Sequence, residues 1–155
     1  MIRKAVESDI DQLLGMANRF IGESGLPLSF DRDIAYKTLE LSIDNSIFMV
    51  YDINGILAGA IMGYVQQEFT IEGCAYIVKL YVEPEFRGLG VSRSMVRAFD
   101  DEAARLGASC CFTSSGSLIG SNGEKLYDNL FIKQGYLPSG RAMVKDYGGS
   151  GTSYS

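Results

Sequence analysis

The fold expected of this chain is decided by the segment Val82-Glu83-Pro84-Glu85-Phe86-Arg87-Gly88-Leu89-Gly90-Val91-Ser92. The residues that lead into it, 75–82, are mostly apolar and rich in β-branched and aromatic side chains, which predicts a strand. After it, apolar side chains recur at the spacing of a helix, at Val91, Met95, Phe99 and Ala103. The segment therefore leads from a strand into a helix.

The glycines of this segment predict a site for an anion. Gly88 and Gly90 allow a tight turn and let a ligand approach the backbone amides closely. The start of the following helix adds unpaired amides and a partial positive charge, and Arg87 adds a cation. We expect the segment to bind a phosphate or pyrophosphate group. A plain turn is the alternative, because a bare Gly-x-Gly does not distinguish the two.

Two common nucleotide motifs fit the segment poorly. A dinucleotide-binding fingerprint needs a third glycine three residues after Gly90, where this chain has Arg93, and it normally opens the first βαβ unit. This weakens a Rossmann-type interpretation. A Walker loop ends in Gly-Lys-Ser/Thr, which neither this segment nor residues 116–125 supply, and that interpretation is rejected.

The run Arg87-Gly88-Leu89-Gly90-Val91-Ser92 resembles the acetyl-coenzyme A signature of the GCN5-related N-acetyltransferases, Arg/Gln-x-x-Gly-x-Gly/Ala, which also follows an apolar strand and a Val-x-Pro step. Ser92 replaces the final glycine or alanine, and its hydroxyl can donate to a phosphate oxygen. The resemblance extends from Ile2-Arg3-Lys4-Ala5 and Asp9 to Lys133-Gln134-Gly135-Tyr136. It covers most of the chain.

The sequence predicts one α/β domain over residues 1–147 and a flexible Gly/Ser-rich tail over 148–155. Strands are expected at 2–5, 47–52, 56–65, 75–82, 109–113 and 141–147, and helices from Ser8 to about Gly22, at 31–43, at 91–106, and from a cap at Ser121 to about Lys133. Asn54-Gly55 predicts a hairpin with a type I′ turn. The resemblance implies a mixed, mostly antiparallel central sheet flanked by helices, whose fourth and fifth strands splay apart to leave a slot for the cofactor.

Composition excludes several classes of protein. The 155 residues carry a net charge of −5, which argues against a nucleic-acid surface. No apolar run approaches the roughly 20 residues of a membrane span, and the start has no signal-peptide core, so we expect a soluble cytoplasmic protein. The absence of histidine excludes a Ser-His-Asp triad, and the three cysteines have no metal-binding spacing. We expect them to be buried reduced thiols.

The resemblance implies acetyl-coenzyme A as the cofactor. In the family its pantetheine arm pairs with the exposed edge of the strand before the signature, so the backbone of Leu80, Tyr81 and Val82 is expected to bind the arm. The pyrophosphate is expected at the signature residues Arg87, Gly88, Leu89, Gly90, Val91 and Ser92. Arg93 can reach a phosphate or remain a solvated helix residue. Asn122 resembles an asparagine that touches the cofactor in the family, although a capping role fits it too.

The expected catalytic acid departs from the family pattern. In the family this acid is often a tyrosine four residues before the glycine that closes the last helix, and here that position is Phe131, which has no proton to donate. Tyr127 lies one turn earlier on the same helical face, about 5.4 Å away along the axis, and is our candidate acid. Packing on the sheet is its alternative role.

The sequence assigns no catalytic base. Residues 75–82 contain no carboxylate, and Glu68 and Glu72 fall in the preceding turn. Glu83 and Glu85 stand beside Arg87, where we expect a surface ion pair.

The function that follows is acetyl-coenzyme A-dependent N-acetyl transfer to a primary amine of a small molecule or polypeptide, by direct attack on the thioester. The first alternative is a catalytically degenerate protein of this fold that binds acyl-coenzyme A as a ligand or sensor, which Phe131 and the missing strand carboxylate favour. The second is a Rossmann-type nucleotide binder. The acidic charge favours a cationic acceptor, and the resemblance allows a homodimer. No metal is expected.

Overall fold

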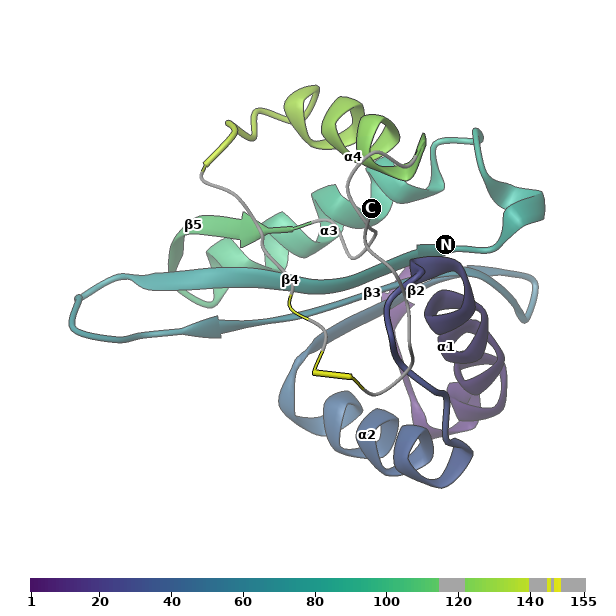
Figure 1. Cartoon of the computed structure of the whole chain (residues 1–155). Helices are drawn as coiled ribbons and strands as arrows, with labels where there is room; N and C mark the ends of the chain where they lie inside the picture. The colour runs from purple at the N-terminus through teal and green to yellow at the C-terminus, as the bar shows by residue number, and fades with distance from the viewer. Residues whose placement is uncertain (115–121, 140–144, 146, 149–155) are drawn as a thin grey trace.

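The computed structural model describes residues 1–114, 122–139, 145, 147 and 148. Within them, five strands form one sheet in the order β1-β2-β3-β4-β5, with α1 and α2 on one face and α3 and α4 on the other (Figure 1). The elements are β1 (Ile2–Lys4), α1 (Ile10–Ser24), α2 (Arg32–Asn45), β2 (Ile47–Ile53), β3 (Ile56–Gln66), β4 (Gly73–Val82), α3 (Val91–Arg105), β5 (Ala108–Thr113) and α4 (Asn122–Ile132), with 3₁₀ turns at Glu7–Asp9 and Pro84–Phe86.

Most predicted elements are present with small shifts at their ends. The predicted type I′ hairpin is confirmed, because Asn54 and Gly55 both have positive φ, at 54° and 87°. The second helix runs to Asn45, two residues further than predicted, and the Asp31 side chain caps its start by accepting from the amide of Ile34 at 2.9 Å. The predicted strand 141–147, the tail and the cap at Ser121 lie outside the described residues, apart from 145, 147 and 148.

The first helix begins at Ile10 and not at Ser8, because Asp9 holds the residues before it in a different turn. The Asp9 carboxylate accepts two hydrogen bonds from Arg3 and one from the amide of Val6, at 2.8 to 2.9 Å. These bonds lower the pKa of Asp9, with the guanidinium of Arg3 as the main cause. The conformation of the chain between β1 and α1 is therefore set by one buried carboxylate.

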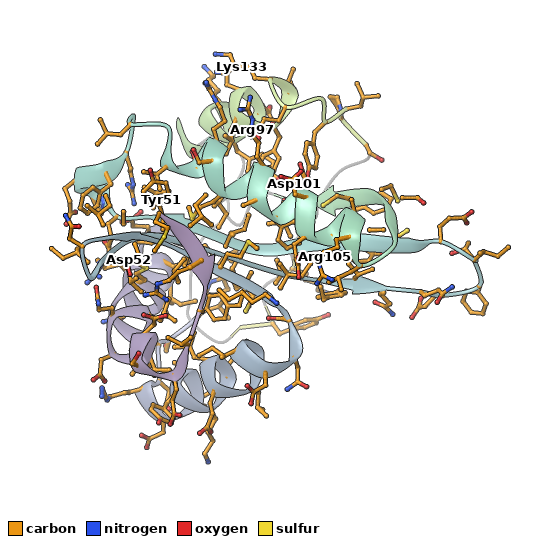
Figure 2. The ribbon with its side chains drawn as sticks, turned by 180° about the vertical axis from the view of Figure 1, so that it is seen from behind. Tyr51, Asp52, Arg97, Asp101, Arg105 and Lys133 are labelled. Carbon is orange, nitrogen blue, oxygen red and sulfur yellow. The ribbon has the colours of Figure 1, made fainter. Side chains whose placement is uncertain are left out.

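The core has two parts, one on each face of the sheet. On one face the predicted apolar stripe of α3 is confirmed, because Val91, Met95, Phe99 and Ala103 are all 4% exposed or less. The other side of α3 carries exposed charged side chains, namely Arg97, Asp101 and Arg105 (Figure 2). On the second face, α1 and α2 cover a cluster that includes Leu13, Leu14, Val50 and Tyr81.

A β-bulge separates β4 into two halves. Met62 of β3 pairs with Lys79, but its neighbour Gly63 pairs with Ile77, so Val78 is an extra residue in β4. The parallel pairing of β4 with β5 ends at the same place, with Ile77 opposite Thr113. β5 ends at this pair, and β4 continues without it to Val82. A bulge bends its strand and increases the local twist, so β4 bends where its pairing with β5 ends.

The expectation of buried cysteines is wrong for Cys110, which is exposed, while Cys74 and Cys111 are partly buried. Cys111 packs against the core on the α3 side, so Cys110, its neighbour in β5, faces the opposite side of the sheet. β5 extends there beyond α1 and α2 (Figure 1). None of the helices within the described residues is long and apolar enough to cross a membrane.

We expect Gly63→Ala to lower the free energy of unfolding by about 1–3 kcal/mol, the usual cost of overpacking. A Cβ atom here would overlap the carbonyl oxygen of Tyr76 and lie 2.6 Å from the ring of Phe99. Urea unfolding measures the change. Gly22→Ala in α1 is the matched control, because a Cβ there meets nothing within 4 Å and should stabilise by about 0.4–1 kcal/mol. Equal effects of the two substitutions would contradict this account of the bulge.

Candidate cofactor and acyl-transfer site

The loop after β4 forms an open cradle of backbone amides. Gly88 and Gly90 have φ of 80° and 83°, and a Cβ at either position would meet nothing within 4 Å. Gly90 is the N-cap of α3 and has no side chain that could accept hydrogen bonds from the first-turn amides. Leu89 is exposed at the tip of the loop, Ser92 is partly buried, and Val91 is buried and anchors the helix in the core. These amides are therefore available to a ligand.

The charges at the start of α3 suit an anionic ligand. Acidic residues stand in the first turns of α1 and α2, where they offset the helix dipole, namely Asp11 and Asp33. The first turn of α3 has none and carries the exposed Arg93. A cation at a helix N-terminus is unfavourable by itself. A bound phosphate would offset both this charge and the dipole.

The Arg87 side chain runs along the end of β4 toward α1. Its Nε donates to the carbonyl of Val82 at 2.9 Å, and its terminal nitrogen donates to Glu23 at 2.7 Å. The guanidinium carbon lies 5.4 Å from the centre of the Tyr81 ring. Arg87 thus connects the signature loop to both β4 and α1, and the carboxylate of Glu23 partly neutralises its charge.

The expected ion pair between Arg87 and Glu83 is wrong, because Glu83 turns to α1 instead. Glu83 is 7% exposed and accepts two hydrogen bonds from Arg19. The partner of Arg87 is Glu23, which also accepts from the hydroxyl of Tyr81 at 3.0 Å. Burial and the hydrogen bond to Glu23 raise the pKa of Tyr81. Sequence reasoning missed Glu23, which lies 64 residues from Arg87 in the chain.

The edge of β4 beyond the bulge presents alternate residues to the opening. The amide of Glu83 donates to the carbonyl of Ala58 in β3 at 2.9 Å. Because antiparallel pairing alternates, the main-chain groups of Tyr81 also face β3, whereas those of Leu80 and Val82 face away from it. Within the described residues no strand pairs with this edge of β4 beyond Ile77, so Leu80 and Val82 present their amides and carbonyls there. The side chain of Tyr81 lies on the face covered by α1 and α2.

Tyr127 lies beside the last residue pair of β4 and β5. Its hydroxyl donates to Oγ1 of Thr113 at 2.8 Å, and Thr113 is the residue opposite Ile77 in the last β4–β5 pair. Burial raises the pKa of Tyr127, so the hydroxyl keeps its proton. Phe131, one turn later, is 3% exposed, and its ring centre lies 4.6 Å from that of Tyr127. Asn122 is the first residue of α4, and its side chain lies outside the described part of the chain.

The end of α4 is attached to α3 by the Gly-Tyr pair that follows it. Gly135 has φ of 87° and lets the chain reverse, and the amide of Tyr136 donates to the carbonyl of Phe131 at 3.1 Å. The Tyr136 hydroxyl donates to Asp100 of α3 at 2.5 Å. This contact holds the helix that carries Tyr127.

The two carboxylates that precede β4 in the sequence lie at the other end of this strand from the cradle. Glu68 and Glu72 belong to the exposed loop that joins β3 to β4, at the end of β4 opposite the cradle (Figure 1). Glu68 accepts a hydrogen bond from the side chain of Gln66. Among the carboxylates in the described part of the chain, Glu23 is the one that accepts a hydrogen bond from a side chain of β4, that of Tyr81.

Comparison with known families agrees with this geometry. A model of the acetyltransferase (GNAT) family matches residues 10–117. The chain belongs to this family. The match spans α1, the whole signature loop, α3 and β5, and it confirms the resemblance inferred from the signature. Membership in the GNAT family supports acetyl-coenzyme A-dependent acetyl transfer in general. A search of curated proteins finds no match.

Solved structures of acetyltransferases share the fold of this GNAT chain at low sequence identity. A "possible acetyltransferase from Clostridium difficile 630" is 15% identical with a TM-score of 0.76, covering 94% of this chain and 95% of that one. The aminoglycoside N-acetyltransferase AAC(6')-Iy in complex with CoA is 12% identical with a TM-score of 0.75, covering 96% and 94%. A "predicted acetyltransferase with acetyl-CoA from Clostridium acetobutylicum" is 16% identical with a TM-score of 0.75, covering 94% and 95%.

We expect Asp100→Asn to change how stability depends on pH. Burial raises the pKa of Asp100 above its ordinary value of 3.8. The native state therefore holds a proton that the unfolded chain has already released, and the stability from this group is lost as pH rises through the native pKa. Urea unfolding from pH 3.5 to 7 should show a smaller loss in the variant. Asp101→Asn removes an exposed neighbouring carboxylate and controls for net charge. Superimposable profiles of wild type and Asp100→Asn would contradict the assignment.

Proposed function

We propose that this GNAT protein is an acetyl-coenzyme A-dependent N-acetyltransferase that acetylates a primary amine by direct attack on the thioester. One observation carries the proposal: the cradle at 88–92 and the hydroxyl of Tyr127 lie at the two ends of the same open edge of β4. The edge between them exposes the main-chain groups of Leu80 and Val82. An elongated ligand with an anionic end and amide groups matches this arrangement.

Each part of the edge has a role in the proposal. The amides of residues 88–92 hold the pyrophosphate, supported by the dipole of α3 and by Arg93. Leu80 and Val82 bind the amides of the pantetheine arm as an added strand would. Arg87 already donates to the carbonyl of Val82, so the Val82 amide and the groups of Leu80 remain for the arm. When bound, acetyl-coenzyme A supplies an activated acetyl thioester.

Tyr127 is the proposed general acid. Its hydroxyl is protonated at neutral pH and lies where the pairing of β4 and β5 ends, so it can donate to a thiolate that leaves there. Thr113 accepts its hydrogen bond and sets the direction of the phenol. The acceptor needs a neutral amine, although an alkyl ammonium with pKa of about 10.4 is almost fully protonated at pH 7. In this proposal solvent removes the proton from the ammonium group, because β4 carries no carboxylate between Gly73 and Val82.

In this proposal the acceptor approaches from the α1 and α2 side of the sheet, because the proposed acid, Tyr127, is carried by α4 on the other side (Figure 1). The net charge of −5 favours a cationic amine. One structural neighbour is an aminoglycoside N-acetyltransferase, so aminoglycosides belong in a first panel with polyamines, amino acids and peptide N-termini.

The activity test combines binding and turnover. Calorimetry with acetyl-coenzyme A measures affinity, and release of free thiol measures acetyl transfer to each amine of the panel. We expect micromolar binding and amine-dependent thiol release. Binding of acetyl-coenzyme A without thiol release on any amine of the panel would favour the sensor alternative. In that alternative, Phe131 stands at the position of a catalytic acid that has been lost. Binding of NAD in place of coenzyme A would contradict the cofactor assignment.

Gly90→Glu should abolish binding of acetyl-coenzyme A, because it places a side chain and a negative charge in the cradle. Gly107→Glu is the matched control: Gly107 also has positive φ, at 92°, with open space around its Cβ position, but it lies at the other end of α3. Backbone strain and added charge are therefore alike in the two variants. Calorimetry on both, after circular dichroism confirms folding, should show binding only in the control. Equal affinities would mean that the loop is a plain turn.

Tyr127→Phe should lower kcat by about 100-fold, as expected for loss of a general acid, with little change in cofactor affinity. Tyr136→Phe is the control, because it removes a partly buried hydroxyl whose hydrogen bond to Asp100 holds α4 on α3 and which we give no part in the proton transfer. It should lower the melting temperature and leave kcat within about threefold of wild type. An unchanged kcat in Tyr127→Phe would return this residue to a packing role.

A further inference from the structure

Two cysteines from neighbouring strands face each other on the sheet surface opposite α3. Cys74 of β4 and Cys110 of β5 are register partners in the parallel pair, and their Sγ atoms lie 3.2 Å apart. The third cysteine, Cys111, packs against the core on the other side of the sheet, and its Sγ lies 3.7 Å from the carbonyl oxygen of Phe112. The sheet therefore pairs Cys74 with Cys110 and keeps Cys111 apart.

The backbone spacing suits a covalent bond between the pair. Adjacent strands lie about 4.8 Å apart, and a disulfide accepts Cα separations of about 4.4–6.8 Å. The sulfur atoms need to approach by about 1.2 Å to reach the bonded distance of about 2.05 Å, which side-chain rotation can supply. The register is irregular here, because Gly73 pairs with Ala108 and Cys74 with Cys110, which leaves Ser109 as an extra residue.

Solvent and small molecules can reach the pair. Cys110 is exposed and Cys74 is partly buried. Two residues further along each strand, the rings of Tyr76 and Phe112 stack on the same face with centres 5.7 Å apart, and Tyr64 of β3 stacks on Tyr76 at 5.2 Å. This stack holds the side chains of the two strands together beside the thiols. The geometry thus offers an accessible dithiol whose partners are held in place.

We propose that Cys74 and Cys110 are a redox modification site that forms a reversible intramolecular disulfide by exchange with a small disulfide such as oxidised glutathione. The exposed Cys110 thiolate attacks oxidised glutathione and releases one glutathione thiolate. The Cys74 thiolate then attacks the Cys110 sulfur and releases the second. Two protein thiols are oxidised to one disulfide, one glutathione disulfide is reduced to two thiols, and the two protons pass to the released thiolates.

The bond would join β4 and β5 just before their pairing ends. Cys74 and Cys110 lie three residues before Ile77 and Thr113, the last pair of the two strands. The closed loop spans 36 residues of sequence, so the disulfide restricts the unfolded chain. We expect the oxidised form to melt about 5–10 °C higher than the reduced form and to exchange amides more slowly at 73–77 and 108–113. This inference is independent of the proposed function.

The test incubates the folded protein in glutathione buffers of increasing oxidation and measures intact mass under acid quench. Wild type and Cys111→Ser should lose about 2 Da, with recovery after dithiothreitol, and neither Cys74→Ser nor Cys110→Ser should do so. Cys111→Ser is the matched control, since it removes the thiol on the other face of the sheet. Peptide mapping of the oxidised wild type should recover a cross-link between Cys74 and Cys110, and this measurement requires no variant to fold.

Three outcomes would overturn the proposal. Wild type and Cys111→Ser remaining fully reduced or stopping at a glutathione adduct would show that the sulfur atoms of Cys74 and Cys110 cannot join. A 2 Da loss in Cys110→Ser would show that Cys74 pairs with Cys111. A disulfide found only in covalent dimers on non-reducing gels would show that the exposed thiol reacts between molecules.

Discussion

The open edge of β4 is the constraint on which the rest of the structure depends. A main-chain amide or carbonyl that is left without a partner away from water costs about 1–3 kcal/mol, so strands inside a sheet normally pair on both sides. Within the described residues, β4 pairs with β5 only as far as Ile77. The protein satisfies one of the remaining groups itself, because Arg87 donates to the carbonyl of Val82. The others suit a ligand that carries amides of its own.

Several features of the fold serve this opening. The bulge at Val78 bends β4 where the pairing ends, and Gly63 is required opposite the bulge because the carbonyl of Tyr76 and the ring of Phe99 leave no room for a Cβ. The bulge also shifts which residues face α3, so that Ala75 and Ile77 face it before the bulge and Leu80 and Val82 after it. Apolar side chains of β4 therefore pack beneath α3 on both sides of the bulge, including the part of the strand that does not pair with β5.

The two ends of the opening differ in how well the sequence predicts them. The cradle was predictable, because Gly88, Gly90 and the apolar stripe of α3 are local signals whose meaning depends on backbone conformation and helical spacing alone. The partners of the charged residues around the cradle were not predictable, because they come from α1, which is far away in the chain. Glu23 of α1 accepts from Arg87, and Arg19 of α1 donates to Glu83. Helical spacing placed Tyr127 and Phe131 on one face, but it could not show that Phe131 is in the core while Tyr127 reaches Thr113.

The sequence by itself determined the order of the elements, the type I′ turn at Asn54-Gly55, the buried face of α3 and the glycine loop that opens it. These features follow from φ preferences and from the periodicity of apolar side chains, which act over a few residues. Only the tertiary structure decided the bulge at Val78, the partners of Arg87 and Glu83, and the contact between Cys74 and Cys110. Each of these depends on strand register or on a contact between distant segments, and a shift of one residue in register would turn the side chains to the other face of the sheet.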